Sequence, residues 1–272
     1  MGDYVYKLVA IDIDGTLIND QRELTQEVYN EIQRVRDRGV KVVLCTGRPI
    51  NGALPFAKKL NMTDKEDYII TFNGALVQNI STKEPIAQIP LSYNDLIDLY
   101  HLSLQLETPM HFFDKEAVYT PNRDISHYTL YEAYANEIPL RYRTVEEIPK
   151  GFTTPKVMFI DDPEKLDITI SKIPEPFRER YAMVKSAPFF YEILHPEVSK
   201  GNAVKQLAER LSIKREEVIC IGDGGNDLSM IEYAGCGVAM ANAVPEVKAI
   251  AQFQTKSNNE HGVAYALQQL IP

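Results

Sequence analysis

The sequence has little of what a disulfide framework or a thiolate or imidazole metal site requires. It contains three cysteines, Cys45, Cys220 and Cys236, an odd number with no metal-ligand spacing. The five histidines are scattered and form no paired motif, so we interpret them as surface or locally bonded side chains. We therefore expect the cysteines to be reduced core residues and no Cys/His metal centre to exist.

Long apolar runs and clusters of positive charge are also missing. No segment reaches the length of a membrane span, and the apolar segment before Asp12 is short and interrupted by Lys7, unlike a signal peptide. The net charge is −9, and no Lys/Arg cluster could neutralise a run of phosphates. We expect neither a membrane nor a nucleic acid as a partner, and a cytoplasmic location as the default. The oligomeric state is left open.

The composition that remains is that of an ordinary globular chain. Apolar residues make up 44% and charged residues 25% of the 272 residues. These fractions are far from the signature of disorder. The length suits one large domain or two modest ones, with enough chain to bury a core.

Several segments repeat one pattern, in which an apolar strand is followed by a turn of small or polar residues and then by a helix. Strands are predicted at residues 6–11, 41–45, 217–221 and 236–240, and a helix at residues 24–38. Such nearly continuous apolar strands are typical of parallel sheets that are covered on both faces. The predicted fold class is therefore α/β, with a Rossmann-like parallel-sheet core.

The pattern changes in the middle of the chain. Between about residues 84 and 188 hairpin-like segments replace it, for example at residues 111–120, and a core strand is expected again at residues 189–194. We predict a catalytic core of residues 1–83 and 189–272, with an inserted α+β cap domain at residues 84–188. Insertions of this kind tend to overhang the strand ends where ligands bind.

Two carboxylates follow the first predicted strand. Residues 12–16 read DIDGT, so Asp12 and Asp14 emerge at the carboxyl end of a strand. Open α/β folds bind their ligands at this edge of the sheet. Taken alone, the segment could be an ordinary turn.

Three further segments also lie at strand ends or helix starts. Thr46 and Gly47 offer a hydroxyl and free backbone amides beside a helix start, which suits a phosphate oxygen. Lys200 offers a positive charge at the start of a helix. Residues 222–227, GDGGND, offer two carboxylates and an amide, from Asp223, Asp227 and Asn226. Singly, these could be a helix cap, a solvated lysine and an Asx turn, but together they favour one site.

Charge then indicates what the site holds. Four carboxylates would crowd together there, those of Asp12, Asp14, Asp223 and Asp227. They would repel one another and a phosphate dianion, so a cation is required. Hard oxygen ligands without thiolate or imidazole favour Mg²⁺, and Lys200 supplies the remaining positive charge.

The four segments resemble the motifs of the haloacid dehalogenase superfamily, which we match to DIDGT, to TGR at residues 46–48, to Lys200 and to GDGGND. The resemblance covers essentially the whole chain. The place of the insert between the second and third motifs is similar to the Cof-type sugar-phosphatase branch, as are FNGA at residues 72–75 and GVAMANA at residues 237–243. Ala241 departs from the more polar residue of many relatives, outside the proposed site.

The resemblance implies an Mg²⁺-dependent phosphatase that hydrolyses small phosphorylated metabolites, with sugar phosphates expected, through a phospho-aspartate. Asp12 would be the nucleophile and a metal ligand. Asp14 would be the general acid and base, with its backbone carbonyl on the metal, and Asp223 would complete the protein ligands. Asp227 would either ligate through water or orient Lys200. The phosphoryl oxygens would be held by the amides of Ile13 and Gly47 and by the side chains of Thr46, Asn226 and Lys200.

Other functions of the same superfamily and of other classes make different demands on these residues. Asp14 argues against a dehalogenase and an ion-pump module, because only a phosphatase or a mutase must protonate an alkoxide. A phosphomutase of the same superfamily and a non-catalytic binding protein remain alternatives. A Walker nucleotide-binding loop does not, because the chain before Lys200 lacks the required glycine spacing.

Overall fold

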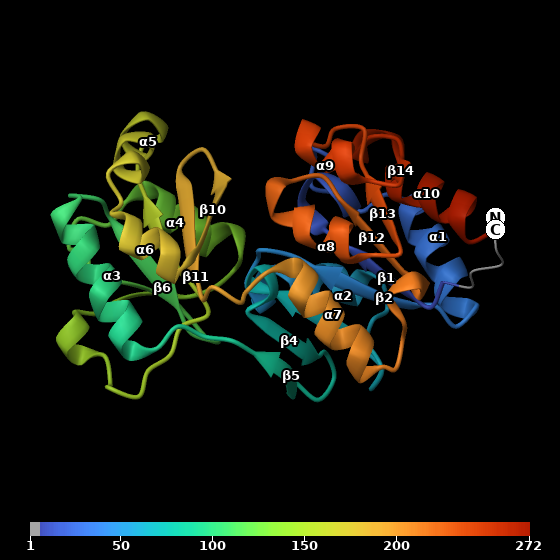
Figure 1. Cartoon of the computed structure of the whole chain (residues 1–272). Coiled ribbons are helices and arrows are strands. Elements are labelled where there is room, and N and C mark those ends of the chain that lie inside the picture. Colours follow the sequence, from blue (N-terminus) through green and yellow to red (C-terminus); the bar gives the residue numbers. More distant parts are fainter. Residues whose placement is uncertain (1–5) are drawn as a thin grey trace. The chain divides into compact units, whose positions relative to one another are not determined.

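The computed structural model describes residues 6–272 and contains two β-sheets (Figure 1). The chain divides into two compact units. One, which we call the core unit, consists of the chain up to Gly47, Ala53–Ala87 and Ser199–Pro272. The other, the insert unit, consists of Arg48–Gly52 and Gln88–Val198.

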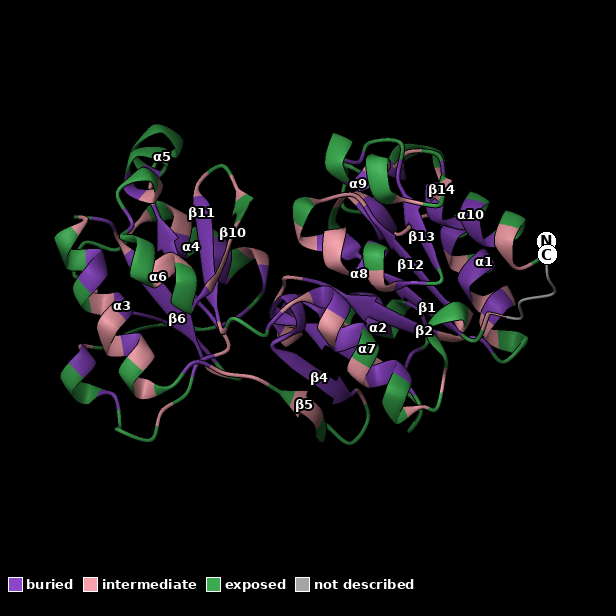
Figure 2. Cartoon of the chain, in the orientation of Figure 1, coloured by how far each residue is buried: buried purple, intermediate pink, exposed green. Residues whose placement is uncertain are grey.

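The core unit is built on an eight-stranded sheet with the order β14-β13-β12-β1-β2-β3-β4-β5. Its strands are β1 (Leu8–Ile11), β2 (Lys41–Cys45), β3 (Tyr68–Thr71), β4 (Leu76–Asn79), β5 (Pro85–Gln88), β12 (Val218–Gly222), β13 (Cys236–Ala239) and β14 (Phe253–Gln254). The pairs from β14 to β3 are parallel, whereas β4 runs antiparallel to β3. Every residue of β1, β12 and β13 is buried, which fits strands covered on both faces (Figure 2). The predicted α/β class with a parallel core is confirmed.

Helices complete the core unit. They are α1 (Gln26–Asp37), α2 (Ile50–Lys59), of which the part from Ala53 belongs to this unit, α7 (Lys200–Arg210), α8 (Leu228–Tyr233), α9 (Pro245–Ile250) and α10 (Gly262–Leu270). Short helical turns lie at Ile13–Leu17, Phe72–Gly74, Arg215–Glu217, Gly225–Asp227 and Asn258–Glu260. Val28, Ile32 and Val35 are buried on one face of α1, which packs against α10, while α7 packs against α8. The apolar period of α1 therefore defines its buried face.

The insert unit has a six-stranded sheet with the order β10-β11-β9-β6-β7-β8. Its strands are β6 (Met110–Phe113), β7 (Val118–Thr120), β8 (Leu140–Tyr142), β9 (Val157–Ile160), β10 (Ala182–Ala187) and β11 (Phe190–Leu194). Its helices are α3 (Tyr93–Gln105), α4 (His127–Ala135), α5 (Pro163–Ser171) and α6 (Glu175–Arg180), with a short turn at Val145–Glu147. All pairs are antiparallel except β7 with β8.

The insert unit has an apolar core of its own. Leu96, Leu99 and Leu102 of α3 belong to one buried cluster with Phe112 and Phe159 of the sheet. The predicted hairpin at residues 111–120 is present as β6 and β7. These contacts explain why the insert folds as a separate compact unit.

The assignment of residues 189–194 to the core is wrong. β11 pairs with β9 and β10 in the insert sheet, and the chain returns to the core unit only at Ser199. A short apolar strand specifies neither its sheet nor its partner, because register and pairing are decided by distant segments. The structure accordingly divides the units at residues 88 and 198 instead of 84 and 188.

The cysteines occupy buried positions as free thiols, as the sequence predicts. Cys45 ends β2 and Cys220 lies in β12, and these two strands flank β1 on opposite sides. The strand order therefore keeps the two thiols on separate strands with β1 between them.

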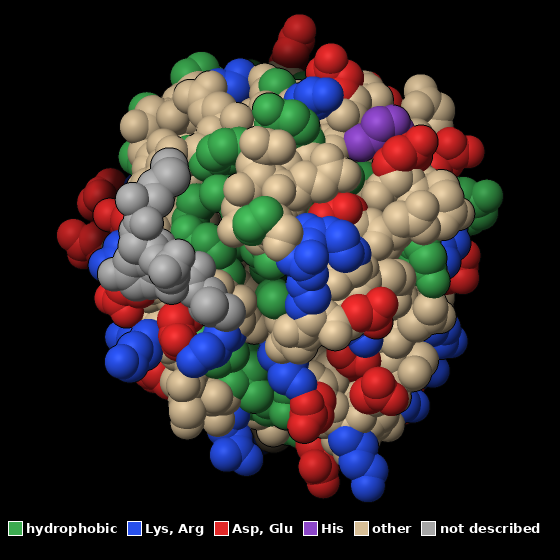
Figure 3. All heavy atoms as spheres, turned by 90° about the vertical axis from the view of Figure 1, so that its right-hand side faces the viewer, with side chains coloured by type: hydrophobic (Ala, Val, Ile, Leu, Met, Phe, Trp, Pro, Cys, Tyr) green, Lys and Arg blue, Asp and Glu red, His purple; other side chains and the backbone are tan. Residues whose placement is uncertain are grey.

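Among residues 6–272, no helix combines the length and the apolar character needed to cross a membrane. Basic and acidic side chains are interspersed on the face shown in Figure 3. On that face, no extended stripe of a single charge sign is seen.

Candidate active site

Asp12 stands directly after the central strand of the core sheet. Its amide donates to the carbonyl of Ile221 at 3.0 Å, which continues the β1–β12 ladder by one residue and fixes the Asp12 backbone. The chain then turns through Ile13–Leu17, with Gly15 at φ +76°. A Cβ on Gly15 would lie 2.4 Å from Oδ2 of Asp223, so both the backbone angle and the close approach require glycine here.

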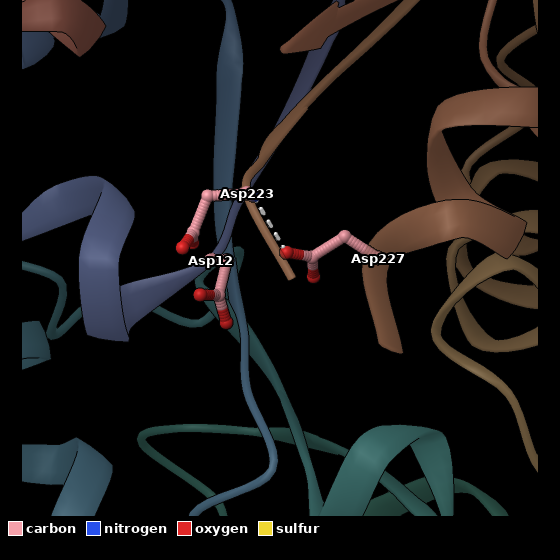
Figure 4. Close-up of side chains that lie close together, drawn as sticks. All are labelled: Asp12, Asp223 and Asp227. Atoms are coloured by element: carbon pink, nitrogen blue, oxygen red, sulfur yellow. Dashed lines mark hydrogen bonds between the residues drawn. The ribbon is translucent and has the colours of Figure 1, made fainter. Parts of the chain in front are cut away.

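Three carboxylates meet at this edge of the sheet (Figure 4). Asp12, Asp223 and Asp227 each contribute an oxygen that lies within 4.8 Å of the others. Asp12 and Asp223 directly follow the neighbouring parallel strands β1 and β12, and Asp227 ends the turn that precedes α8. Asp14 lies on the turn that follows Asp12, and its side chain is exposed.

Lys200 is buried against two of these carboxylates. Ser199 caps α7 by accepting from the amide of Asn202 at 3.1 Å. Lys200, the first residue of the helix, has 0% of its surface exposed. Its Nζ donates to Oδ1 of Asp12 at 2.5 Å and to Oδ1 of Asp227 at 2.6 Å. Burial disfavours the ammonium, but the two carboxylates outweigh burial and raise the pKa of Lys200 above its ordinary value.

Asp227 has partners on both of its carboxylate oxygens. Oδ1 accepts from Lys200, and Oδ2 accepts from the backbone amides of Asp223 at 2.8 Å and Gly224 at 2.9 Å. Its side chain is fully buried. Asp227 therefore fixes both the lysine and the loop that carries Asp223.

The charges of the cluster are not balanced by its own residues. One ammonium faces the three carboxylates of Asp12, Asp223 and Asp227. Burial, followed by repulsion from Asp227, raises the pKa of Asp223 to about 6. Burial also raises the pKa of Asp12 despite Lys200. Hard oxygen donors with uncompensated negative charge fit a divalent cation.

Two residues that support Asp223 were not predicted as site residues. The hydroxyl of Thr16 donates to Oδ1 of Asp223 at 2.8 Å. The side-chain amide of Asn242 donates to the carbonyl of Gly15 at 2.8 Å and lies 3.4 Å from Oδ2 of Asp223. Thr16 belongs to the segment DIDGT and Asn242 to the segment GVAMANA, and both segments resemble family motifs. The sequence could not show that these two residues contact Asp223, because the contacts join segments that are far apart in the chain.

The residues predicted to bind phosphate all belong to the core unit. Thr46 is buried after β2, and its amide donates to the carbonyl of Ile70 at 3.0 Å. The expectation of a free amide at Thr46 is therefore wrong, because the sheet ladder continues through it. The hydroxyl of Thr46 remains the group predicted to bind a phosphate oxygen. Gly47 follows Thr46, and Ile13 is buried beside Asp12.

Asn226 lies on the turn that precedes α8, and its Nδ2 donates to Oδ1 of Asn73 at 3.0 Å. Asn73 was noted only as part of FNGA and not as a site residue. Its signal in the sequence was weak, because an asparagine before a glycine has an ordinary explanation as a turn. The structure thus joins the loop after β3 to the loop after β12.

Known proteins resemble this chain over nearly its whole length. Residues 9–267 match the family model of the haloacid dehalogenase-like hydrolases. A Bacillus subtilis protein named "Putative phosphatase YxeH" is 59% identical over 267 residues, which cover 98% of this chain and 99% of the relative. A second B. subtilis protein, named 5-amino-6-(5-phospho-D-ribitylamino)uracil phosphatase YwtE, is 31% identical over 97% of this chain and 98% of its own length. The crystal structure of a haloacid dehalogenase-like hydrolase from Bacteroides thetaiotaomicron superposes with a TM-score of 0.88, at 32% identity, covering 97% of this chain and 99% of that one.

Proposed function

Because the chain belongs to the haloacid dehalogenase-like hydrolases and is a phosphatase of that family, we propose that it is an Mg²⁺-dependent enzyme that hydrolyses a small phosphorylated metabolite through a phospho-aspartate on Asp12. The observation that carries this proposal is the buried contact of Lys200 with Asp12 and Asp227 beside the carboxylate of Asp223. This contact fixes the Asp12 carboxylate at the place where we propose that the cation and the phosphoryl group bind.

In the first step, an oxygen of Asp12 attacks phosphorus and the bond from phosphorus to the ester oxygen breaks. Lys200 holds Asp12 at the strand end, so the attacking group loses little orientational freedom during the reaction. Asp14 gives its proton to the leaving alkoxide. Its exposed position on the turn leaves its carboxyl group accessible to substrate and water.

In the second step, Asp14 accepts a proton from a water molecule that attacks the phospho-aspartate. The bond between phosphorus and the Asp12 oxygen breaks, and inorganic phosphate is released. The side chain of Asp12 is thereby returned to its carboxylate form.

Mg²⁺, held by Asp12, Asp223 and the backbone carbonyl of Asp14, would offset the negative charge of the phosphoryl group and of the carboxylates. We assign Asp227 to positioning, because its two oxygens are engaged by Lys200 and by backbone amides. The amides of Ile13 and Gly47 and the side chains of Thr46, Asn226 and Lys200 bind the phosphoryl oxygens.

We further propose that the insert unit selects the substrate. All the residues assigned above belong to the core unit, so the insert unit is left to contact the rest of the metabolite. The chain enters the insert unit directly after Gly47 and leaves it directly before Ser199. Two of its junctions therefore adjoin segments assigned to phosphate binding.

Sugar phosphates and phosphorylated sugar alcohols are the substrate class that we propose. The support is the sequence resemblance to Cof-type sugar phosphatases and the phosphoribityl group in the name of the relative YwtE. The test is to incubate purified protein and Mg²⁺ with a panel of phosphorylated sugars, sugar alcohols, nucleotides and cofactors, and to measure inorganic phosphate. Binding without release of phosphate from any member would contradict the proposal.

Removal of the metal should abolish phosphate release. Exhaustive chelation followed by dialysis should reduce the rate to background, and added Mg²⁺ should restore it. Asp223→Ala should raise the Mg²⁺ concentration for half-maximal activity by at least about tenfold, because loss of a direct ligand should cost no less than loss of an outer-shell contact. Calorimetric titration with Mg²⁺ measures the same change without turnover. Asp20→Ala, which removes an exposed carboxylate bonded to Asn259, is the matched control. A full rate after chelation would rule out the metal.

Replacement of Gln88–Val198 by a short glycine-serine linker should flatten the preference among phosphate esters. Contacts with the non-reacting part of a substrate align its phosphoryl group, and the linker would remove them. Rates across the panel measure the effect, and Asp12→Asn in the shortened protein shows whether the remaining activity uses the same site. An unchanged rank order in a folded, active core would count against this role.

A further inference from the structure

The turn after β3 has an unusual backbone. Phe72, Asn73 and Gly74 have φ values of +52°, +56° and +102° in succession. Asparagine and glycine tolerate this region, but a bulky aromatic residue seldom adopts it. Phe72 and Asn73 are nevertheless 2% and 4% exposed, so surrounding contacts hold the strained turn in place.

This turn contacts three segments to which we have assigned phosphate binding. The amide of Asn73 donates to the carbonyl of Thr46 at 3.0 Å. Oδ1 of Asn73 accepts from Nδ2 of Asn226 at 3.0 Å. A Cβ on Gly74 would lie 2.4 Å from the carbonyl of Ser199, the residue that caps the helix of Lys200.

The Asn73 side chain also packs against the phosphate-binding segment after β2. A Cβ on Gly47 would lie 3.0 Å from Oδ1 and 3.1 Å from Nδ2 of Asn73. The carboxamide therefore lies between Gly47 and Asn226. The NH₂ group of Asn226 has two hydrogens, and the bond to Asn73 uses one while leaving the other to donate elsewhere.

We infer that Asn73 is a positioning residue for phosphoryl binding, which acts by fixing the amide of Asn226 beside Gly47. The inference rests on the proposed function, because it supposes that Asn226 donates to a phosphoryl oxygen. The left-handed turn brings the Asn73 carboxamide against Gly47 and Asn226. The backbone strain is thus part of how the loop after β3 holds the loops after β2 and β12.

Asn73→Gly tests the effect of the side chain alone, because glycine accepts the same positive φ but lacks the carboxamide. With p-nitrophenyl phosphate as substrate, we expect KM and the inhibition constant of inorganic phosphate to rise about three- to tenfold, the size expected for one hydrogen bond. The Mg²⁺ concentration for half-maximal activity should stay within twofold, because Asn73 bonds Thr46 and Asn226, which we assign to phosphoryl binding and not to the metal.

Coupling to Asn226 is the decisive readout. Asn226→Ala should weaken phosphate inhibition by itself, and Asn73→Gly should add less than twofold in that background. Asn79→Gly is the matched control, since Asn79 is another buried asparagine, whose side chain bonds Lys65 and Thr82. It should lower the thermal midpoint and leave the phosphate constants unchanged.

Two results would overturn the inference. One is a lower thermal midpoint of Asn73→Gly with both phosphate constants within twofold of wild type. The other is a full, additive effect in the Asn226→Ala background. Calorimetric titration of the unaltered protein with inorganic phosphate separates this inference from the proposed function. A protein that binds phosphate but hydrolyses no ester would refute the function alone, and one that does neither would refute both.

Discussion

Asp12→Asn should reduce phosphate release by on the order of 10⁴-fold or more, because an amide cannot attack phosphorus and no other carboxylate is fixed by Lys200 at the end of β1. No phosphate should be trapped on the protein in a rapidly quenched reaction. Phosphate release and intact-protein mass spectrometry measure the two effects.

The same variant should fold at least as stably as the unaltered protein when metal is absent. The substitution removes one buried carboxylate from a cluster of three, and Lys200 keeps its contact with Asp227. A buried ion cluster with excess charge contributes little net stability, so the removal of one of its carboxylates relieves repulsion. Thermal unfolding measures this, and mass spectrometry excludes deamidation back to aspartate. Substantial residual turnover without deamidation would show that Asp12 is not the nucleophile.

Asp14→Asn should separate the two proton transfers. The amide can neither protonate an alkoxide nor deprotonate water, and loss of such help costs on the order of 10²–10⁴ in rate. A sugar phosphate has a poor leaving group, so its first step should collapse. The nitrophenolate of p-nitrophenyl phosphate leaves readily, so its first step should largely survive, while hydrolysis of the phospho-enzyme still lacks its base.

Stopped-flow absorbance should therefore record a burst of nitrophenol near one equivalent, followed by a stall with phosphate trapped on Asp12. Asp20→Asn is the matched control. Asp20 is also an exposed carboxylate and lies six residues after Asp14, but its side chain bonds Asn258 and Asn259. It should leave the ratio of aryl to alkyl rates unchanged. Equal slowing of both substrates by Asp14→Asn, without a burst, would falsify the role of Asp14.

The parallel core could be predicted because its information is local. Each core strand is a short apolar run followed by a polar turn, and parallel strands bring their carboxyl ends to one edge of the sheet. This pattern predicts that Asp12 and Asp223 lie near each other, and in the structure an oxygen of each lies within 4.8 Å of the other. The prediction failed for β11 (Phe190–Leu194), whose apolar pattern is the same but whose partners are β9 and β10.

The sequence by itself determined which residue types stand at the strand ends, and with them the α/β class, the acidic cluster and the excess of negative charge. Only the tertiary structure decided which groups pair inside that cluster. Lys200 could have been a solvated lysine at a helix start, but the packing of α7 buries it between Asp12 and Asp227. Asn73 could have been an ordinary turn residue, yet it has a left-handed backbone and bonds Asn226, which lies 153 residues away in the sequence. The physical reason is that hydrogen bonds and ion pairs between distant segments depend on the packing of whole elements, which no local run of residues specifies.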